Sequence, residues 1–145
     1  MQILILIFVS MMPFIELRGA IPIGIAMGLN PITVYLASVF GSTIVGMPLI
    51  LFFRYILKVL KNIDKFKNFA HKLEDKLLSK MKKMKKVSLL GLILFVGVPI
   101  PTTGSWSASG IASLLEMRIR DAIIGIFLGN ALAGLIMLTL SVNIF

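Results

Sequence analysis

The sequence predicts an all-α integral membrane protein made of two similar units that insert in opposite directions. Hydrophobic residues make up 58% of the 145 residues, and the mean hydropathy is +1.00, which is far above the range of soluble domains. Two uncharged stretches are each long enough to cross a bilayer as a helix. The chain also aligns with itself, without gaps, at a shift of 88 residues. We therefore expect one membrane domain over residues 1–145.

The first unit, residues 1–53, begins with an apolar segment that is too short to cross the membrane. Residues 1–12 would form about 18 Å of helix, whereas the hydrocarbon core is about 30 Å thick. A bend follows, and the residues expected to shape it are Pro13, Gly19 and Pro22. This pattern predicts a re-entrant helical hairpin over residues 1–29, followed by a transmembrane helix over residues 32–53.

The middle segment, residues 54–86, carries the whole excess of positive charge. It contains twelve basic and three acidic residues, which equals the net charge of +9 of the chain. Its apolar residues recur every three or four positions, as in an amphipathic helix. By the positive-inside rule this segment is cytoplasmic, where it can lie on the membrane surface as an anchor or bind lipid headgroups. We expect His71 to be solvated.

The second unit, residues 87–145, repeats the first. We expect a re-entrant hairpin over residues 87–117, shaped by Pro99, Pro101 and Gly104, and a transmembrane helix over residues 121–142. Each unit crosses the membrane once, so the two units have opposite orientations. This inverted repeat is typical of secondary transporters, whose sites lie at the midplane between broken helices.

Two arginines outside the basic segment test the predicted orientation in the membrane. A re-entrant second hairpin returns Arg118 and Arg120 to the cytoplasmic side, as the positive-inside rule favours, and places both termini outside. We therefore predict a multi-pass protein of the cell membrane.

A carboxylate and a guanidinium stand in the first bend, within otherwise apolar sequence. Charges in the membrane interior are costly and usually mark a pathway, so Glu16 and Arg18 are the first functional candidates. A structural ion pair is the alternative. Residues two apart do not face each other on a regular helix, so the pair converges more easily where the chain is bent. Arg18 suits a phosphate or carboxylate ligand, and Glu16 suits proton exchange.

The second bend carries neutral hydrogen-bonding groups instead of charges. The candidates for substrate binding here are Thr102, Thr103, Ser105 and Trp106, with Ser107 as a further hydroxyl. The alternative is that these hydroxyls bond back to the broken helix. Secondary candidates are Arg118, Arg120, Asp121 and Asn130.

Two stretches resemble the signature sequences of the putative small multidrug export protein family, within the broader DedA (SNARE-associated, VTT-type) superfamily. They run from Glu16 to Pro22 and from Pro99 to Trp106. The resemblance implies two opposed re-entrant hairpins. It also implies translocation of a lipid such as polyprenyl phosphate in bacterial members, lipid scrambling in eukaryotic relatives, and dependence on the proton-motive force in some. Glu16 matches the acidic position of the first hairpin. The arginines typical of the second hairpin in DedA proteins are absent, and Thr102, Thr103 and Trp106 stand there instead.

These observations favour a small transporter or flippase for an anionic amphiphile, with membrane lipids as partners. The alternatives are a proton-coupled exporter of small molecules and a membrane assembly subunit. An enzyme acting on lipid phosphates is disfavoured, because the sequence has no acidic metal cluster, histidine pair or nucleophile beside a base. We expect no cofactor and no metal, since cysteine is absent and His71 is the single histidine. We also expect no nucleic-acid binding, and a homo-oligomer, most simply a dimer.

Overall fold

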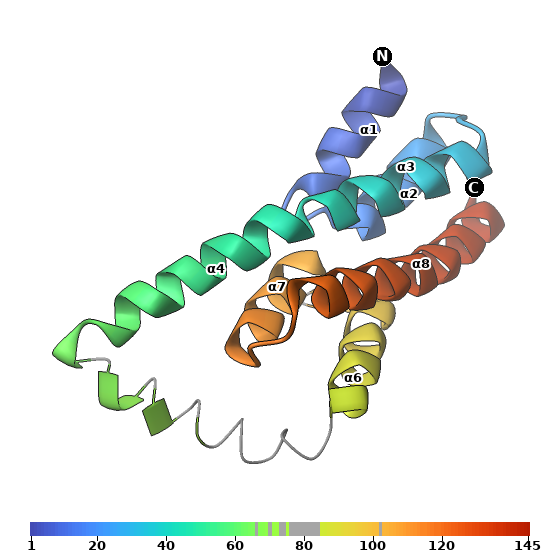
Figure 1. Ribbon diagram of the computed structural model, residues 1–145. Helices are drawn as coiled ribbons and strands as arrows, with labels where there is room; N and C mark the ends of the chain where they lie inside the picture. Colours follow the sequence, from blue (N-terminus) through green and yellow to red (C-terminus); the bar gives the residue numbers. More distant parts are fainter. Residues whose placement is uncertain (66, 70, 73–74, 76–84, 102) are drawn as a thin grey trace.

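The computed structural model describes residues 1–65, 67–69, 71–72, 75, 85–101 and 103–145. In this part of the chain the secondary structure is helical and contains no strand, which confirms the all-α prediction. Figure 1 labels the helices α1 (Gln2–Met11), α2 (Glu16–Ala26), α3 (Pro31–Ile44), α4 (Gly46–Lys61), α6 (Lys85–Gly97), α7 (Ser105–Leu114) and α8 (Ile119–Ile144). Two stretches, Pro31–Lys61 and Ile119–Ile144, are long and apolar enough to cross a membrane.

Each half of the chain contains a pair of short helices joined by a turn, where a hairpin was expected. The first bend is shorter than the sequence indicated. It covers residues 12–15, and α2 already begins at Glu16, so the charged pair lies in the first turn of a helix. Pro22 lies inside α2, where it removes the amide that would bond to the carbonyl of Arg18. The prediction of a bend that extends to Pro22 was therefore wrong.

The transmembrane helix expected over residues 32–53 is interrupted and longer than expected. Helix α3 ends at Ile44, a turn residue follows at Val45, and α4 continues to Lys61. Pro48 explains the interruption, because it has no N–H to donate to the carbonyl of Ile44. The basic residues from Arg54 to Lys61 therefore belong to α4, and the rest of the basic segment follows it.

The turns that follow α2 and α7 have the same hydrogen bonds, 88 residues apart. In the first turn, the amides of Gly28 and Leu29 donate to the carbonyls of Ile25 and Gly24. In the second turn, Glu116 and Met117 donate in the same way to Ser113 and Ala112. Both are Schellman-type helix ends, and the residue with positive φ is Gly28 (74°) in one and Glu116 (50°) in the other.

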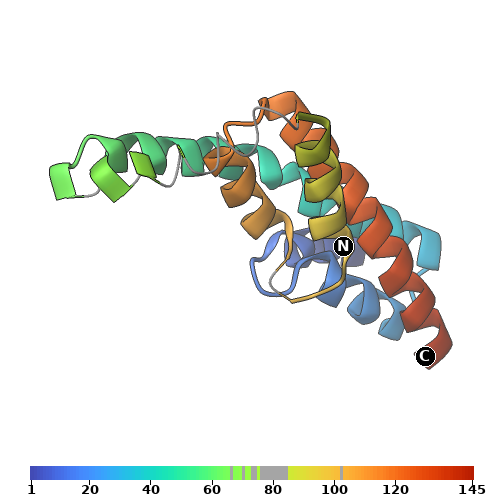
Figure 2. The same cartoon turned by 90° about the horizontal axis from the view of Figure 1, so that it is seen from below.

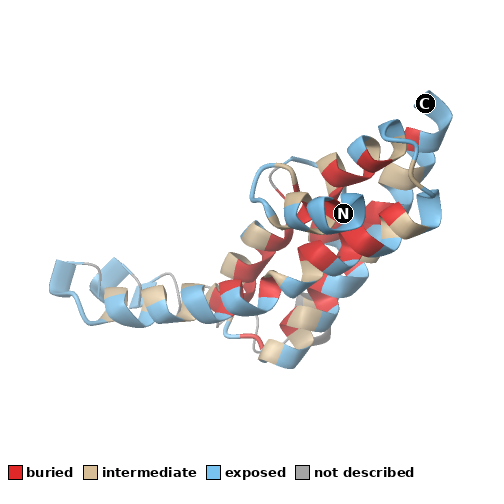
Figure 3. Ribbon diagram, turned by 90° about the horizontal axis from the view of Figure 1, so that it is seen from above, coloured by how far each residue is buried: buried red, intermediate tan, exposed pale blue. Residues whose placement is uncertain are grey.

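Helix α8 is shared by the two hydrophobic clusters of the protein. One cluster joins α8 to α1, α2 and α3, and includes Leu6, Ile21 and Ala133. The other joins α8 to α4, α6 and α7, and includes Ile50 and Ile126. Figure 3 shows the buried residues gathered where these helices cross. As a result, α2 and α7 lie in the centre of the molecule, each packed against α8.

Helix α4 extends beyond this core as an arm (Figure 1). Two contacts connect the second half of α4 to the α7–α8 turn: Arg54 donates to the carbonyl of Met117, and Nζ of Lys61, the last residue of α4, lies 3.5 Å from a carboxylate oxygen of Glu116. About half of the predicted amphipathic segment beyond Lys61 lies outside the described residues, although His71 is described and is exposed.

Candidate functional site

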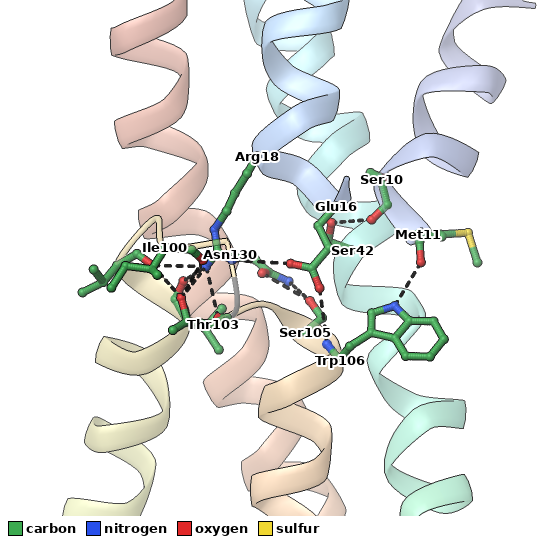
Figure 4. Close-up of polar contacts among 12 residues, drawn as sticks. Ser10, Met11, Glu16, Arg18, Ser42, Ile100, Thr103, Ser105, Trp106 and Asn130 are labelled. Carbon is green, nitrogen blue, oxygen red and sulfur yellow. Dashed lines mark hydrogen bonds and ion pairs between the residues drawn. The ribbon is translucent and has the colours of Figure 1, made fainter. Parts of the chain in front are cut away.

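The two turns that join the short helices meet in the centre of the molecule. Figure 2 shows the α1–α2 turn beside the α6–α7 connection, and Figure 4 shows the polar contacts between them. The charged side chains come from α2, whereas most of the groups that they contact belong to residues 96–106 of the other half. The site is therefore built across the two halves of the chain.

Arg18 holds the end of α6 and the connection that follows it. Its Nη2 donates to the carbonyl of Val96 at 2.9 Å, near the last turn of α6. The same nitrogen lies 3.1 Å from the carbonyls of Val98 and Thr103, and 3.0 Å from the Thr103 hydroxyl. The guanidinium thus binds backbone oxygens at and after the end of α6, where the helix supplies no further amide donors.

Glu16 holds the start of α7. Its Oε1 accepts the amide of Trp106 at 3.4 Å, and the amide of Ser105 also faces the carboxylate. Its Oε2 lies 3.6 Å from Nη1 of Arg18, and 7% of the side chain is exposed. The backbone of Glu16 has φ 47°, in the left-handed region. Such a conformation costs about 1–3 kcal/mol and is kept where the surroundings require it.

The two charges complement the ends of the broken helix pair. A helix carries partial negative charge at its C-terminus and partial positive charge at its N-terminus. Arg18 lies at the C-terminal end of α6, and Glu16 lies at the N-terminal end of α7. Each charge therefore interacts favourably with a helix end and with the other charge, which offsets the cost of their burial.

The α6–α7 connection brings together several of the residues predicted to bind substrate. Thr103 is buried, and its hydroxyl donates to the carbonyl of Val98 at 2.8 Å. Trp106 donates from its indole nitrogen to the carbonyl of Met11 at 3.2 Å, which ties α7 to the end of α1. A Cβ at Gly104 would overlap the Glu16 carboxylate, so this position requires glycine. Thr102 lies outside the described residues, and Ser107 is exposed.

Asn130 of α8 extends the polar site away from the ion pair. Its side-chain nitrogen donates to the Ser105 hydroxyl at 3.0 Å and to the Thr43 hydroxyl at 3.1 Å, and 1% of the residue is exposed. Ser105 is the first residue of α7 and its amide faces Glu16. A continuous chain of hydrogen-bonding groups therefore runs from Glu16 to α3.

A row of serines continues from Ser105 along the buried face of α7. Ser109 and Ser113 donate to the carbonyls of the residues four before them, at 2.6 and 2.7 Å. Their oxygens also lie 3.4 and 3.2 Å from the carbonyls of Gly46 and Ile50 in α4. These small polar residues allow α7 and α4 to approach closely.

An apolar groove of about 850 Å³ lies beside the polar site, where α3 and α4 meet α8. Thr43 lines this groove, and so does Met11, whose carbonyl accepts the Trp106 indole. None of the described residues that line it is charged. The groove is thus connected to the Glu16 site through two hydrogen-bonded routes.

The three charged secondary candidates lie away from the ion pair. Arg118 and Arg120 are exposed and come after the far end of α7, a helix about 15 Å long. Asp121 lies in the first turn of α8, where a carboxylate suits the helix dipole. Pro13 lies in the α1–α2 turn, Gly19 in α2, and Pro99 and Pro101 between α6 and α7.

Three contributors to the site were missed or underrated from the sequence. Asn130 was only a secondary candidate, although an amide inside an apolar span is itself a signal. Thr43 gave no signal, because a lone threonine is common in membrane helices. Pro48 could have predicted the break in the long span. Among the described residues, no group of three His, Cys, Asp or Glu side chains lies together as a metal site would require.

Comparison with known protein families gives a match. The family model described as "Putative small multi-drug export protein" matches residues 16–136, which begins at Glu16 and covers most of the chain. No curated protein and no solved structure matches. The family and the two apolar helical stretches indicate a membrane protein with a role in transport rather than in catalysis. The chain belongs to the small multi-drug export protein family.

Proposed function

We propose that this protein is a proton-coupled exporter of small amphiphilic molecules, with Glu16 as the proton-exchanging group. One observation carries the proposal: the Glu16 carboxylate is buried, is paired with Arg18, and accepts the amide at the start of α7. A proton on Glu16 would therefore weaken two contacts at once. It would remove the charge that attracts Arg18, and it would weaken the hold on α7.

The exchange follows from these two states. With Glu16 ionised, α7 is held and the substrate binds from the cytoplasmic side. A proton that arrives from the outside neutralises Glu16, loosens the start of α7 and releases the substrate outward. The proton then leaves to the cytoplasm, and the contacts with Arg18 and Trp106 form again. One proton moves inward for each release, so the proton gradient drives export.

The same proposal includes the membrane arrangement expected from the sequence. The two helix pairs are re-entrant hairpins of an inverted repeat, with the basic segment at the cytoplasmic face and both termini outside. The Schellman-type ends, 88 residues apart, support a repeat, because α2 and α7 end in the same way. The central meeting of the two turns supports a site at the midplane, as in other inverted-repeat transporters.

A second candidate is translocation of a lipid phosphate, as the resemblance to the DedA superfamily implies. A specific observation favours it: Nε and Nη1 of Arg18 are buried and have no hydrogen-bond partner. Each of these nitrogens could donate to a phosphate oxygen. Against this candidate, Nη2 is already surrounded by backbone oxygens, so the guanidinium is partly used in holding the protein together.

The experiment uses purified protein in liposomes that contain a pH-sensitive dye, under an inward proton gradient. Two probes that differ only in their headgroup are compared: nitrobenzoxadiazole-labelled dodecanol and the corresponding dodecyl phosphate. We expect probe-dependent proton entry with the alcohol, and its loss in Glu16→Gln. Asp121→Asn is the matched control, because this carboxylate lies at the start of α8, apart from the ion pair.

Each outcome decides between the candidates. Proton entry with the phosphate alone, lost in Arg18→Ala, would favour the lipid-phosphate translocase. Probe movement without proton entry, unaffected by Glu16→Gln, would contradict proton coupling. The absence of any response to either probe would contradict both candidates as stated.

A further inference from the structure

The apolar groove beside the polar site is large, and it has polar groups at its base. It encloses about 850 Å³, which lies in the range of small-molecule sites. Its outer wall consists of exposed apolar side chains from α3, α4 and α8, among them Phe40, Met47 and Phe127. The groove has room for a substantial length of alkyl chain.

Two residues with hydroxyls line the groove, Thr43 and Tyr35, and the Tyr35 hydroxyl already donates to the carbonyl of Ala131 at 3.1 Å. Thr43 lines the groove and its hydroxyl accepts a hydrogen bond from Asn130 at 3.1 Å, so the proton of this hydroxyl is still available to donate. Close to Thr43, Pro48 leaves the carbonyl of Ile44 without its usual intrahelical donor, and both residues line the groove. A ligand headgroup here meets the Thr43 hydroxyl and a carbonyl that lacks its i+4 donor.

These groups select the headgroup by its chemistry. No described residue that lines the groove is charged, so a phosphate or carboxylate would lose its hydration without a counter-charge. A hydroxyl both donates and accepts, and it can pair with the Ile44 carbonyl and the Thr43 hydroxyl together. The complementary ligand is an uncharged amphiphile with a long apolar chain and a hydroxyl head.

The base of the groove is also connected to the ion pair. Thr43 contacts Asn130, Asn130 contacts Ser105, and the amide of Ser105 faces Glu16. A second route runs from Met11, which lines the groove, to Trp106, whose amide donates to Glu16. Loosening of the start of α7 therefore disturbs the two hydrogen bonds that fix the base of the groove.

We propose that the groove between α3, α4 and α8 is the substrate site for an uncharged, hydroxyl-bearing amphiphile, and that Asn130 couples its occupancy to Glu16. Asn130 is a positioning residue, because it acts through Thr43 and Ser105. The proposal rests on the proposed export function, since it names the substrate class of that exporter. It predicts that neutralisation of Glu16 weakens binding in the groove.

The first test locates the ligand. Purified protein in lipid nanodiscs is photolabelled with hexadecanol that carries a diazirine in mid-chain, and the labelled residues are identified by mass spectrometry. We expect labels on groove residues such as Phe40, Met47 and Phe127. Ile44→Trp, which fills the groove, should reduce this labelling at least tenfold. Ile32→Trp is the matched control, because Ile32 is an exposed isoleucine of α3 outside the groove lining.

The second test measures the headgroup contact by competition with unlabelled hexadecanol and hexadecane. We expect hexadecanol to compete better in the wild type, and Thr43→Val to remove about fivefold of this preference, the value of one hydrogen bond. Thr33→Val, on the same helix and outside the groove lining, should change nothing. Equal competition by the alcohol and the alkane in the wild type would show a lipid-chain crevice without headgroup recognition, and would overturn the proposal.

The third test measures the coupling by a double-mutant cycle. Glu16→Gln should weaken hexadecanol binding about threefold or more in the wild type, and clearly less in the Asn130→Leu background. Thr43→Val interrupts the same series of hydrogen bonds and leaves the contacts of α7 intact. It replaces Asn130→Leu in the cycle if that variant fails to fold. Binding that resists Ile44→Trp would overturn the site. Proton coupling lost in Glu16→Gln, with an unchanged affinity in the groove, would overturn the coupling while leaving the proposed function intact.

Discussion

The α1–α2 turn and the α6–α7 connection correspond in sequence at a shift of 88 residues, yet the first is followed directly by two charged residues and the second has neutral residues at the matching positions. Position 16 of the first half corresponds to position 104 of the second at the shift of 88 residues. The first is Glu16, and the second is Gly104, whose missing side chain leaves the space that the Glu16 carboxylate fills. The first half therefore carries the charges, and the second half supplies the helix ends with which these charges interact.

This difference shows how a buried pair of charges in one half can stabilise helix ends in the other half. The second hairpin has no charge near its break in the described residues, so its helix ends depend on Glu16 and Arg18 of the first. An ion pair that stabilised only its own hairpin would give no reason to move another helix on protonation. Because the contacts cross between the halves, loss of the Glu16 charge would weaken the contacts that hold the start of α7 in the other half.

The largest effect is expected for removal of the cation. Arg18→Ala should lower the free energy of unfolding by about 3–5 kcal/mol, because it leaves Glu16 buried without its counter-charge. Denaturant unfolding in detergent micelles measures this change. Arg118→Ala, at an exposed position, is the matched control and should change stability by less than about 0.5 kcal/mol. Similar effects of the two substitutions would show that the Arg18 contacts are not stabilising.

The next effect tests the correspondence between Glu16 and Gly104. Gly104→Ala should cost about 1–3 kcal/mol, because the new Cβ overlaps the carboxylate. In the Glu16→Gly background the same substitution should cost much less. Gly91→Ala is the control, since no atom lies within 4 Å of its Cβ position in α6, and it should be neutral or slightly stabilising. Additive costs in the double variant would contradict the correspondence.

Similar losses of stability are expected at the two places where the first short helix of each half crosses a longer helix. These are the crossings of α1 with α3 and of α6 with α8. A Cβ at Gly41 would meet Ser10 and the backbone of Ile7, and a Cβ at Gly129 would meet Val96 and lie 3.0 Å from the Ile93 carbonyl. Gly41→Ala and Gly129→Ala should each cost about 1–3 kcal/mol in the same unfolding experiment. A large cost at one position with none at the other would show that the halves do not pack alike.

The smallest effect concerns the two Schellman-type turns. Gly28→Ala should cost about 1 kcal/mol through the backbone alone, because φ is 74° and no atom lies within 4 Å of its Cβ position. Glu116→Gly should raise the stability or leave it unchanged. Glycine relieves the strain of the left-handed backbone, whereas the half-exposed ion pair with Lys61 is lost. Thermal unfolding of both variants measures these shifts. A marked loss of stability in Glu116→Gly would mean that the Lys61 contact outweighs the backbone term.

Much of the fold could be predicted because it depends on local pattern. The span expected over residues 121–142 is α8, and the short apolar leaders are α1 and most of α6. The buried charges were found for the same reason, since Glu16 and Arg18 interrupt apolar sequence. The bend was placed too far along the chain because Pro22 is a weaker break within α2 than its residue type indicated.

The partners of the charges could not be predicted, because they are backbone groups far away in the sequence. Arg18 binds carbonyls 78 or more residues away, and a carbonyl has no signature in the residue type. Asn130 and Thr43 join the site only because α8 and α3 are packed together. Arg54 looked like part of a cytoplasmic basic segment, although it holds the α7–α8 turn.

The most direct test of the central claim is amide hydrogen exchange at the start of α7, in wild-type protein and Glu16→Gln. If the Glu16 charge holds this helix end, residues 103–108 should exchange about tenfold faster in the variant, which corresponds to about 1.4 kcal/mol. The α2–α3 turn should exchange at an unchanged rate, because its bonds do not involve Glu16. Equal exchange at residues 103–108 in the two proteins would contradict the claim that the charges of one half hold the helix of the other.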